Sequence, residues 1–565
     1  MLQAIGNITD SALSIIAPTY AAKRMHARAV IKQLATFAAA ERGRSTKSWK
    51  TTTKTADEAI IPDLPLMTAR ARDLCRDNSH ARSIVRSFGR NVVGRGITPE
   101  SAIEIATDDP AMQELDEQLD RLWELWATTP AWCDVEGRRT FYDMQRVASE
   151  QLVEAGEAFF VMSMEGNAAD GMVPLKLQFI EAEQLDPSIT KDVNTGNAIV
   201  GGVEIDDKGR PVAYHIRPIT ASPSGRQARG YQAVQSYAND PVRYEADRVL
   251  HVYRPDRAGQ VRGYTWLAPV LIRLHNLQKF DDAYLWAAQL EASIGVIIKR
   301  VGANSMIGAG GGSGLNAPLG SDNVDEDGNR EFNFRPGMVA ELEPGEDVTA
   351  FNPQRPSGVY EAYTMAQLKS IAAGVDLSYP QVSRDFHQGN FSSQRQAKLE
   401  DERAWQSIQD LLIASLCRPV RNAFVRLASS FDIVPGLPSP EELRAVAGAD
   451  YLAADWMPDG WAWVEPVREA QAEKIAVEEL LDTRGAVLNR RGRSFRKVVR
   501  AAKRERQMLD EAGLQPLAER KFSIAEKAAD EAAKQEDDED IDGGGQQPGE
   551  AGEDDDASIG DENSD

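Results

Sequence analysis

The sequence predicts an α+β fold built from several domains. Helical patterns of apolar residues occupy both ends of the chain, whereas residues 156–253 alternate apolar and polar residues between turns, as antiparallel strands do. The chain has 565 residues, and a single hydrophobic core rarely grows beyond about 250–300 residues. Its 42% of hydrophobic and 27% of charged residues are typical of a globular protein.

The first strongly patterned segment, residues 64–93, predicts two helices that are broken near Asp77 and Asn78. The second helix has an apolar face at helical spacing, formed by Ile84, Val85, Phe88 and Val92. A second stripe, at i, i+4 spacing, consists of Arg82, Arg86 and Arg90. Such a stripe is most often a solvated or ion-paired face. The more specific hypothesis is a seam with a neighbouring subunit.

The middle of the chain predicts strands supported by helices. Thr140 with Asp143 indicates the start of a helix that extends to Ala155. GEAFFVMSM (156–164) and PLKLQFIEAEQLDP (174–187) have the β-branched and aromatic residues typical of strands. Two alternating runs joined by residues 207–210 predict a hairpin.

Further helices are predicted after the strands, over residues 267–294, 358–373, 392–427 and 466–520. The Gly-rich, polar residues 302–330 between the first two predict a mobile loop. The last helical segment contains the basic run NRRGRSFRKVVRAAKRER (489–506).

The net charge of −23 is unevenly distributed. Residues 530–565 contain sixteen acidic residues and one Lys, a net charge of −15, which leaves −8 for the other 529 residues. This tail is predicted to be a disordered extension. It either serves solubility or acts as a contact arm for a basic partner. The three widely spaced cysteines form no disulfide framework, which indicates a reducing compartment. No run of about 18 apolar residues predicts a membrane span.

Patterns of reactive residues are missing from the sequence. It contains no GxxxxGK[ST], GxGxxG or HExxH motif, and its six histidines are scattered. A partial match to a calcium-binding loop at 323–334 lacks two ligands, because Asn323 and Phe334 occupy positions that need carboxylates. We therefore predict a structural or binding protein with no catalytic residue, metal or cofactor. A nuclease using dispersed carboxylates such as Asp281 and Asp282 is the enzymatic alternative.

Several segments, in order along the chain, resemble the lambda-type portal family of tailed bacteriophages. They include ARARDLCRDNSHARSIVRSFGRNVVGRGITP (69–99), GEAFFVM (156–162), LQFIEAEQLD (177–186), RVLHVYRPDRAGQVRGYTWLAPVLIRLHNLQKFDDAYLWAA (248–288) and GVDLSYPQVSRDFHQGNFSSQRQAKLEDERAW (374–405). The resemblance covers roughly residues 15–430. It implies a non-enzymatic subunit of a ring, typically a dodecamer, through which DNA enters and leaves the capsid.

The resemblance also implies an order of parts, the portal fold of wing, helical stem, α/β clip and helical crown. The expected ranges are an N-terminal arm (1–60), wing (61–266), stem helix (267–294), clip with the Gly-rich loop (295–356), second stem helix (357–375), tunnel loop (376–391), wing helix and following segment (392–465), crown (466–525) and disordered acidic tail (526–565).

In this arrangement the tunnel loop approaches double-stranded DNA, and its candidate contact residues are Arg384, His387, Gln388 and Asn390. The overall acidity is compatible with DNA passage, because a channel in which DNA slides must not grip phosphates tightly. The implied partners are further copies of the chain, the terminase large subunit, head–tail adaptors and the major capsid or scaffold protein, with no membrane. The implied location is the capsid portal vertex of the virion, with assembly in the host cytoplasm. A head–tail adaptor or assembly scaffold is the structural alternative.

Overall fold

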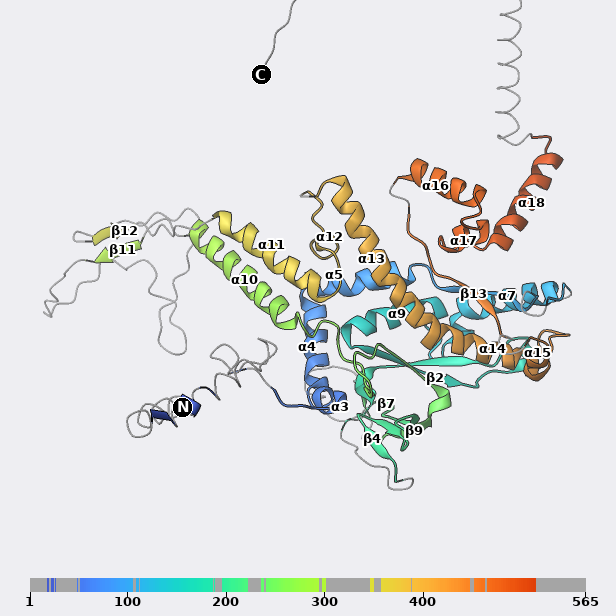
Figure 1. Ribbon diagram of the computed structural model, residues 1–565, viewed down its shortest axis with the longest axis horizontal. Coiled ribbons are helices and arrows are strands. Elements are labelled where there is room, and N and C mark those ends of the chain that lie inside the picture. Colours follow the sequence, from blue (N-terminus) through green and yellow to red (C-terminus); the bar gives the residue numbers. More distant parts are fainter. Residues whose placement is uncertain are drawn as a thin grey trace, which may run out of the picture.

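The computed structural model describes residues 51–514 and a few positions before residue 51, with internal gaps at 105–107, 111, 186, 188–195, 222–234, 238–239, 294–296, 301–345, 350–356, 388, 448–451 and 463–464. The predicted mobile loop at 302–330 and the acidic tail at 526–565 lie outside the described residues. The α+β class is confirmed: helices lie above and beside a three-stranded and a four-stranded antiparallel sheet, and a pair of helices projects from one end of this body (Figure 1).

The N-terminal helices have the predicted break. They are α3 (Ala56–Ile60), α4 (Leu64–Asp77), α5 (Ser79–Phe88) and the π-helical turn η2 (Gly89–Val93). Asn78 lies between α4 and α5 in an extended conformation, and its side-chain oxygen accepts a hydrogen bond from the backbone N–H of Ala81 at 2.9 Å. This is an N-cap, which satisfies a backbone donor at the start of a helix. The break therefore comes from capping by Asn78.

Three helices follow: α7 (Met112–Thr128), α8 (Pro130–Cys133) and α9 (Phe141–Glu154). Thr140 and Asp143 form the predicted capping box, in which each side chain bonds the backbone N–H of the other residue. Trp123 and Trp126 of α7 are fully buried against the ring of Phe141.

The β region is antiparallel, as predicted. One sheet has the order β10-β2-β3, and a second has the order β4-β5-β6-β9. The strands are β2 (Glu157–Ser163), β3 (Lys176–Ile180), β4 (Ala198–Val200), β5 (Val203–Ile205), β6 (Pro211–Ile216), β7 (Ile219–Ala221), β8 (Gln235–Tyr237), β9 (Val242–Glu245) and β10 (Val249–Tyr253). The predicted hairpin is the β5–β6 pair, whose turn is closed by Arg210, which donates to Asp206 from both its backbone and its guanidinium.

Helices α10 (Leu271–Ser293) and α11 (Ser357–Gly374) lie side by side and project from the body, with the short strands β11 (Ile297–Arg300) and β12 (Glu346–Thr349) beyond them (Figure 1). The rings of Phe280 and Tyr284 on α10 meet Tyr360 and Tyr363 on α11. Helix α10 begins four residues after the predicted start at Leu267, because residues 266–270 form turns. No helix within the described residues is long and apolar enough to cross a lipid bilayer.

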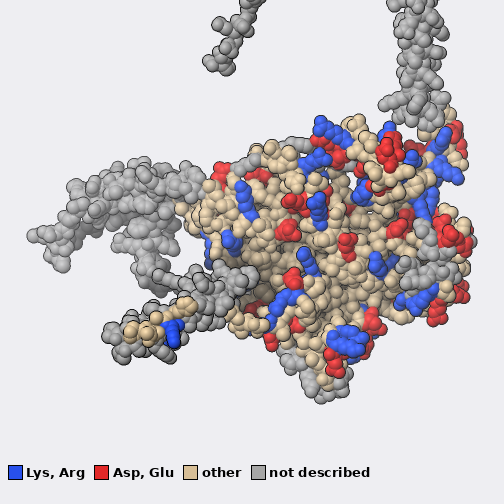
Figure 2. Space-filling view, viewed as in Figure 1, with Lys and Arg blue, Asp and Glu red and all other residues tan. Residues whose placement is uncertain are grey.

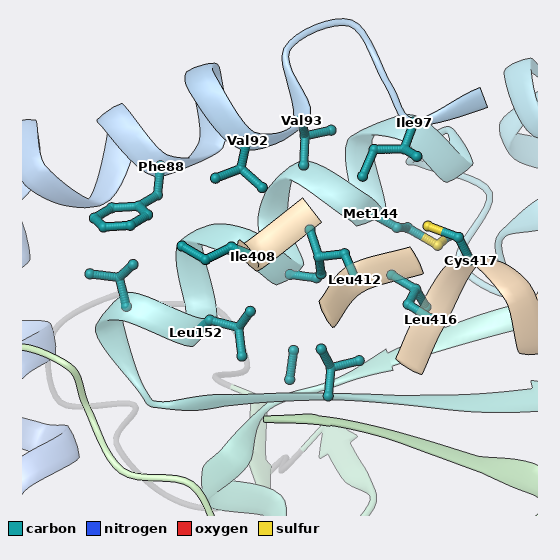
Figure 3. Packing of buried hydrophobic residues seen from close by; sticks show 14 of the residues in the cluster. Phe88, Val92, Val93, Ile97, Met144, Leu152, Ile408, Leu412, Leu416 and Cys417 are labelled. Carbon is teal, nitrogen blue, oxygen red and sulfur yellow. The ribbon is translucent and has the colours of Figure 1, made fainter. Parts of the chain in front are cut away.

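A long, nearly continuous helical segment forms the centre of the body. It consists of α13 (Phe391–Leu412), a π-helical turn (Ile413–Cys417) and α14 (Arg418–Ser430). Ile408, Leu412 and Leu416 from this segment pack with side chains of α5 and α9, such as Phe88 and Leu152 (Figure 3). The main core thus joins residues that are more than 300 positions apart in the sequence.

The C-terminal part of the described chain is helical and contains one strand. Its elements are α15 (Pro440–Ala447), β13 (Ala454–Met457), α16 (Pro466–Glu478), α17 (Arg484–Asn489) and α18 (Phe495–Glu511). Strand β13 pairs antiparallel with β1 (Thr98–Ser101). This pairing ties the segment before α16 to the N-terminal half of the chain.

One buried ion pair joins both sheets to the segment before α10. Glu157 is 1% exposed, and it accepts hydrogen bonds from Nε of Arg262 at 2.9 Å and the backbone N–H of Gly263 at 2.8 Å. Arg262, 2% exposed, also donates to the carbonyl oxygens of Ala182 at 3.1 Å and of Gly201, between β4 and β5. Burial alone would raise the pKa of Glu157, but Arg262 and a hydrogen bond with His251 lower it to about 2.

The backbone of residue 264 comes very close to the backbone just before β2, and this close approach explains why a glycine precedes the strand. Gly156 has φ +92°, and a Cβ at this position would lie 2.0 Å from the backbone carbon of Tyr264. A side chain here would therefore displace the segment that carries Arg262.

Replacing Asn78 by alanine is expected to destabilise the protein by about 1–2 kcal/mol. The substitution removes the N-cap, which is worth about 0.5–2 kcal/mol, and the hydrogen bond from Nδ2 to Oε1 of Gln278 on α10 at 3.2 Å. Urea unfolding followed by circular dichroism measures this effect. Asn78→Asp keeps the capping oxygen but loses the donor to Gln278, so its effect should be smaller. Equal stability of wild type and Asn78→Ala would contradict the role of the cap.

Candidate nucleic-acid interface

The predicted tunnel loop, residues 376–391, contains a short helix. Ser378 precedes it and donates to Asp401 of α13 from its backbone N–H at 2.7 Å and from its hydroxyl at 2.6 Å. Helix α12 (Tyr379–Ser383) then has Pro380 in its first turn, where proline is tolerated. Val382 is 1% exposed and belongs to the main core. Between α12 and α13, the described residues 384–387, 389 and 390 belong to no helix or strand.

Arg384 folds back from this linker onto α5. It has a left-handed backbone, with φ +60°, and ends α12. Its Nε donates to the hydroxyl of Ser83 at 3.3 Å, and its Nη1 donates to Oε1 of Gln381 at 3.2 Å. Partial burial and the positive charge of Arg90 lower the pKa of Arg384. Within the described residues, Arg384 forms no ion pair with the neighbouring Asp385.

The predicted arginine stripe lies on the exposed side of α5 and η2. Arg82, Arg86 and Arg90 are all exposed, and Nε of Arg90 donates to the carbonyl oxygen of Arg86 at 3.3 Å. Because Arg384 bonds Ser83 between two of these positions, the structure brings two separate predictions together. We call Arg82, Arg86, Arg90 and Arg384 the arginine cluster. Within the described chain, none of its four guanidinium groups forms a close ion pair with a carboxylate, although the charge of Arg86 acts on the carboxyl group of Glu150.

The other predicted loop residues have different surroundings. His387 is fully exposed, and its backbone N–H and Nδ1 lie 3.0 and 3.3 Å from Oδ1 of Asp385. The backbone hydrogen bond from His387 is the largest cause that lowers the pKa of Asp385. Asn390 caps α13 by accepting from the backbone N–H of Ser393 at 2.8 Å. Gln388 lies outside the described residues.

Gln394 holds the linker in place and was missed by the sequence analysis. Its Nε2 donates to the carbonyl oxygens of Phe386 at 2.7 Å and Gly389 at 3.2 Å. A pocket of about 210 Å³ lies beside it, between α12 and α13, with Pro380, Phe386 and Lys398 among its lining residues. The sequence carries no local signal for this role of Gln394. For Asn390 it does, because an Asn directly before a helical pattern indicates an N-cap.

Groups suited to metal or nucleophilic chemistry are sparse in the described part of the chain. There, no three His, Cys, Asp or Glu residues come together as a metal site. Asp281, a carboxylate of the enzymatic alternative, accepts a hydrogen bond from the hydroxyl of Tyr360 across the α10–α11 pair at 3.0 Å. Cys75, Cys133 and Cys417 are buried, and burial raises the pKa of each thiol.

Comparison with known protein families shows to which family the chain belongs. The profile described as "Phage portal protein, lambda family" matches residues 42–409. The chain belongs to the lambda family of phage portal proteins. It is 25% identical over 462 residues to the probable portal protein of Halomonas phage phiHAP-1, covering 81% of this chain and 83% of the relative. It is 22% identical to portal protein B of Escherichia phage lambda, covering 84% and 89%.

Two solved structures share a weaker similarity with the chain. One is the virion of a native gene transfer agent, with 12% identity, a TM-score of 0.36 and coverage of 74% of this chain and 94% of the other. Another is an HK97-family phage portal protein from Corynebacterium diphtheriae, with 11% identity, a TM-score of 0.26 and coverage of 72% and 95%. Both TM-scores are below 0.5, so membership of the portal family rests on the sequence matches. The predicted family is thereby confirmed.

Proposed function

We propose that this portal-family chain forms a closed ring, expected to be a dodecamer, whose axial channel passes double-stranded DNA during packaging and ejection. The match to the lambda portal family over residues 42–409 carries this proposal. The ring occupies the portal vertex of the virion after assembly in the host cytoplasm. It contacts the major capsid or scaffold protein, binds the terminase large subunit during packaging, and later binds head–tail adaptors. The sequence has no phosphate-binding GxxxxGK[ST] motif, so we assign ATP hydrolysis during packaging to the bound terminase.

The described elements support the proposed order of parts. The projecting α10–α11 pair suits a stem, and the strands β11 and β12 beyond it suit a clip that faces the terminase. The two sheets with α4, α5, α7 and α9 suit a wing, and α16–α18 suit a crown. Helix α12 divides the tunnel loop proposed from the sequence, and the described residues 376–378, 384–387, 389 and 390 lie outside any helix or strand.

The arginine cluster contributes to two proposed surfaces, one that faces DNA and one that faces a neighbouring subunit. Arg384 and His387, at the end of α12, would face DNA together with Gln388 and Asn390, whereas Arg82, Arg86 and Arg90 would face a neighbouring subunit. Arg82, Arg90 and Arg384 form no ion pair with a carboxylate of the described chain, and Arg86 interacts with Glu150 only electrostatically, without a close ion pair. Such a cluster of guanidinium groups favours an anionic partner. A phosphate or a carboxylate of the next subunit supplies the missing charge.

Two variants separate these roles. Arg384→Ala with His387→Ala should leave rings intact, but it should reduce DNA retained in packaged heads about tenfold, because a contact to a charged group contributes about 1.5–3 kcal/mol. Arg86→Glu with Arg90→Glu should instead reduce ring formation. Electron microscopy of the purified chain measures rings, and packaging with the cognate terminase measures retained DNA.

Arg76→Glu is the matched control, because Arg76 is an exposed arginine of α4 that pairs with Asp73 and Asp77. A wild-type chain that remains monomeric would overturn the proposed function. Rings that assemble but retain DNA normally in the Arg384 and His387 variant would overturn only the role of the loop.

A further inference from the structure

The C-terminal helices α16, α17 and α18 form a unit without a core of its own. None of the three helices has a buried residue. Yet residues 466–514 contain eight large apolar side chains that are exposed: Val467, Ile475, Leu480, Leu481, Phe495, Val499, Met508 and Leu514. Apolar surface of this kind, rimmed by charges, is typical of an interaction site.

Leu480 is the most exposed of these side chains. It lies just after α16, and its side chain is 90% exposed. Its backbone is left-handed, with φ +58°, which is unfavourable for a bulky residue. Leu481, the next residue, is 80% exposed. The end of α16 therefore presents two adjacent leucines that the described chain leaves uncovered.

Charge is divided between the two ends of this unit. Residues 466–482 contain five acidic and two basic residues, a net charge of −3. Residues 484–506 contain ten basic residues and one acidic residue, a net charge of +9. Figure 2 shows Lys and Arg side chains gathered over α18, at the upper right of the molecule.

Some of these charges attach the unit to its own subunit. Arg496 lies 3.3 Å from Glu104, and Arg500 lies 3.2 Å from Glu117 of α7. Within the unit, Arg491 pairs with Glu473 at 2.7 Å. Two of these ion pairs attach α18 to the N-terminal half of the chain, and the third joins α16 to the residues before α18. The exposed apolar residues take no part in them.

A different stripe of α18 remains free. Lys497, Ala501, Arg504 and Met508 are all exposed and follow i, i+4, i+7, i+11 spacing, which places them on one face. Within the described chain no carboxylate pairs with Lys497 or Arg504, and Glu479 at the end of α16 likewise has no cationic partner. The chain thus has a basic, partly apolar stripe and an acidic, apolar helix end that do not meet within one copy.

We propose that residues 466–514 dock head to tail on the same unit of a second copy of the chain. The end of α16, with Glu478, Glu479, Leu480 and Leu481, packs on the Lys497–Met508 stripe of the neighbour. Each copy uses both surfaces, as a heterologous interface requires when rotation closes a ring. The inference rests on the proposed ring. DNA on α18 is less suitable, because phosphate contacts would leave the leucines and Met508 uncovered.

Reciprocal charge reversal tests this contact in the full-length chain. Lys497→Glu with Arg504→Glu, or Glu478→Lys with Glu479→Lys, should each raise the subunit concentration needed for half-assembly about tenfold. The two reversals combined in one chain should restore most of the assembly, because opposite charges then face each other again. Analytical ultracentrifugation and electron microscopy measure assembly, and circular dichroism verifies folding.

A matched control separates pairing from net charge. The control combines the Lys497 and Arg504 reversal with Glu165→Lys and Asp170→Lys, two exposed positions far along the chain from the unit. It has the same net charge as the reciprocal variant. Its assembly should not recover. Recovery in this control, or normal assembly of both single-side reversals, overturns the inference while the ring proposal stands. So does a loss of DNA binding with assembly unchanged. A monomeric wild-type chain overturns the ring proposal itself.

Discussion

Replacing Arg262 by methionine is expected to destabilise the protein by about 3–5 kcal/mol, because removal of one partner leaves a buried charge uncompensated. Arg262 is 2% exposed and supplies the positive charge for Glu157, which is 1% exposed. Its guanidinium also bonds carbonyl oxygens in both parts of the β region, at Ala182 and Gly201. Urea unfolding of the full chain measures the loss.

The double variant Arg262→Met with Glu157→Leu distinguishes a lost charge partner from a lost side-chain volume. It should be considerably more stable than Arg262→Met alone, since apolar replacement of a whole buried pair is often tolerated. Arg210→Ala is the control, because Arg210 forms an exposed pair with Asp206, and such pairs contribute about 0–1 kcal/mol. An effect of Arg262→Met no larger than that of Arg210→Ala would contradict the stabilising role of the Glu157–Arg262 ion pair.

The pH dependence of wild-type stability provides a second measurement of the Glu157–Arg262 ion pair. The pKa of Glu157 is about 2 in the folded protein against an ordinary value of 4.5. A depressed carboxyl pKa contributes stability that is present above pH 4.5 and is lost as the pH falls towards 2. The difference between wild type and Glu157→Gln should therefore shrink over this interval.

Local chemistry explains why much of the fold was predictable from the sequence. The helix start at Thr140 depends on side chains within three residues. The hairpin at 207–210 depends on a short turn between alternating runs, and the break at Asn78 depends on a cap one turn away. In each case the residues that determine the structure are sequence neighbours, so a pattern of spacing contains the information.

Contacts between distant segments explain what the sequence did not reveal. Arg384 bonds Ser83, about 300 residues earlier, and nothing near either residue indicates the other. Strand β13 is short and depends on β1 for its pairing. The sequence predicts a loop where α12 lies, because five residues are too few to show a helical period, and because Ser378 is fixed by Asp401 on another helix. The sequence therefore does not predict that Arg384 lies beside Arg82, Arg86 and Arg90, and only the folded structure brings them together.

Replacing Trp123 by alanine is expected to cost about 3–5 kcal/mol, the usual range for truncating a large buried aromatic residue. Trp123 is 2% exposed, and its ring centroid lies 5.0 Å from Trp126, 5.4 Å from Phe141 and 5.1 Å from Phe424. These rings come from α7, α9 and α14, so the cavity left by alanine would loosen three helices together. Urea unfolding followed by far-ultraviolet circular dichroism measures the loss.

Leu125→Ala is the matched control for this core, because Leu125 lies on the same helix and is 54% exposed. Its effect should stay within about 0.5 kcal/mol, as for most surface substitutions. Trp123→Ala with a loss below 1 kcal/mol would show that the aromatic cluster does not hold α7, α9 and α14 together.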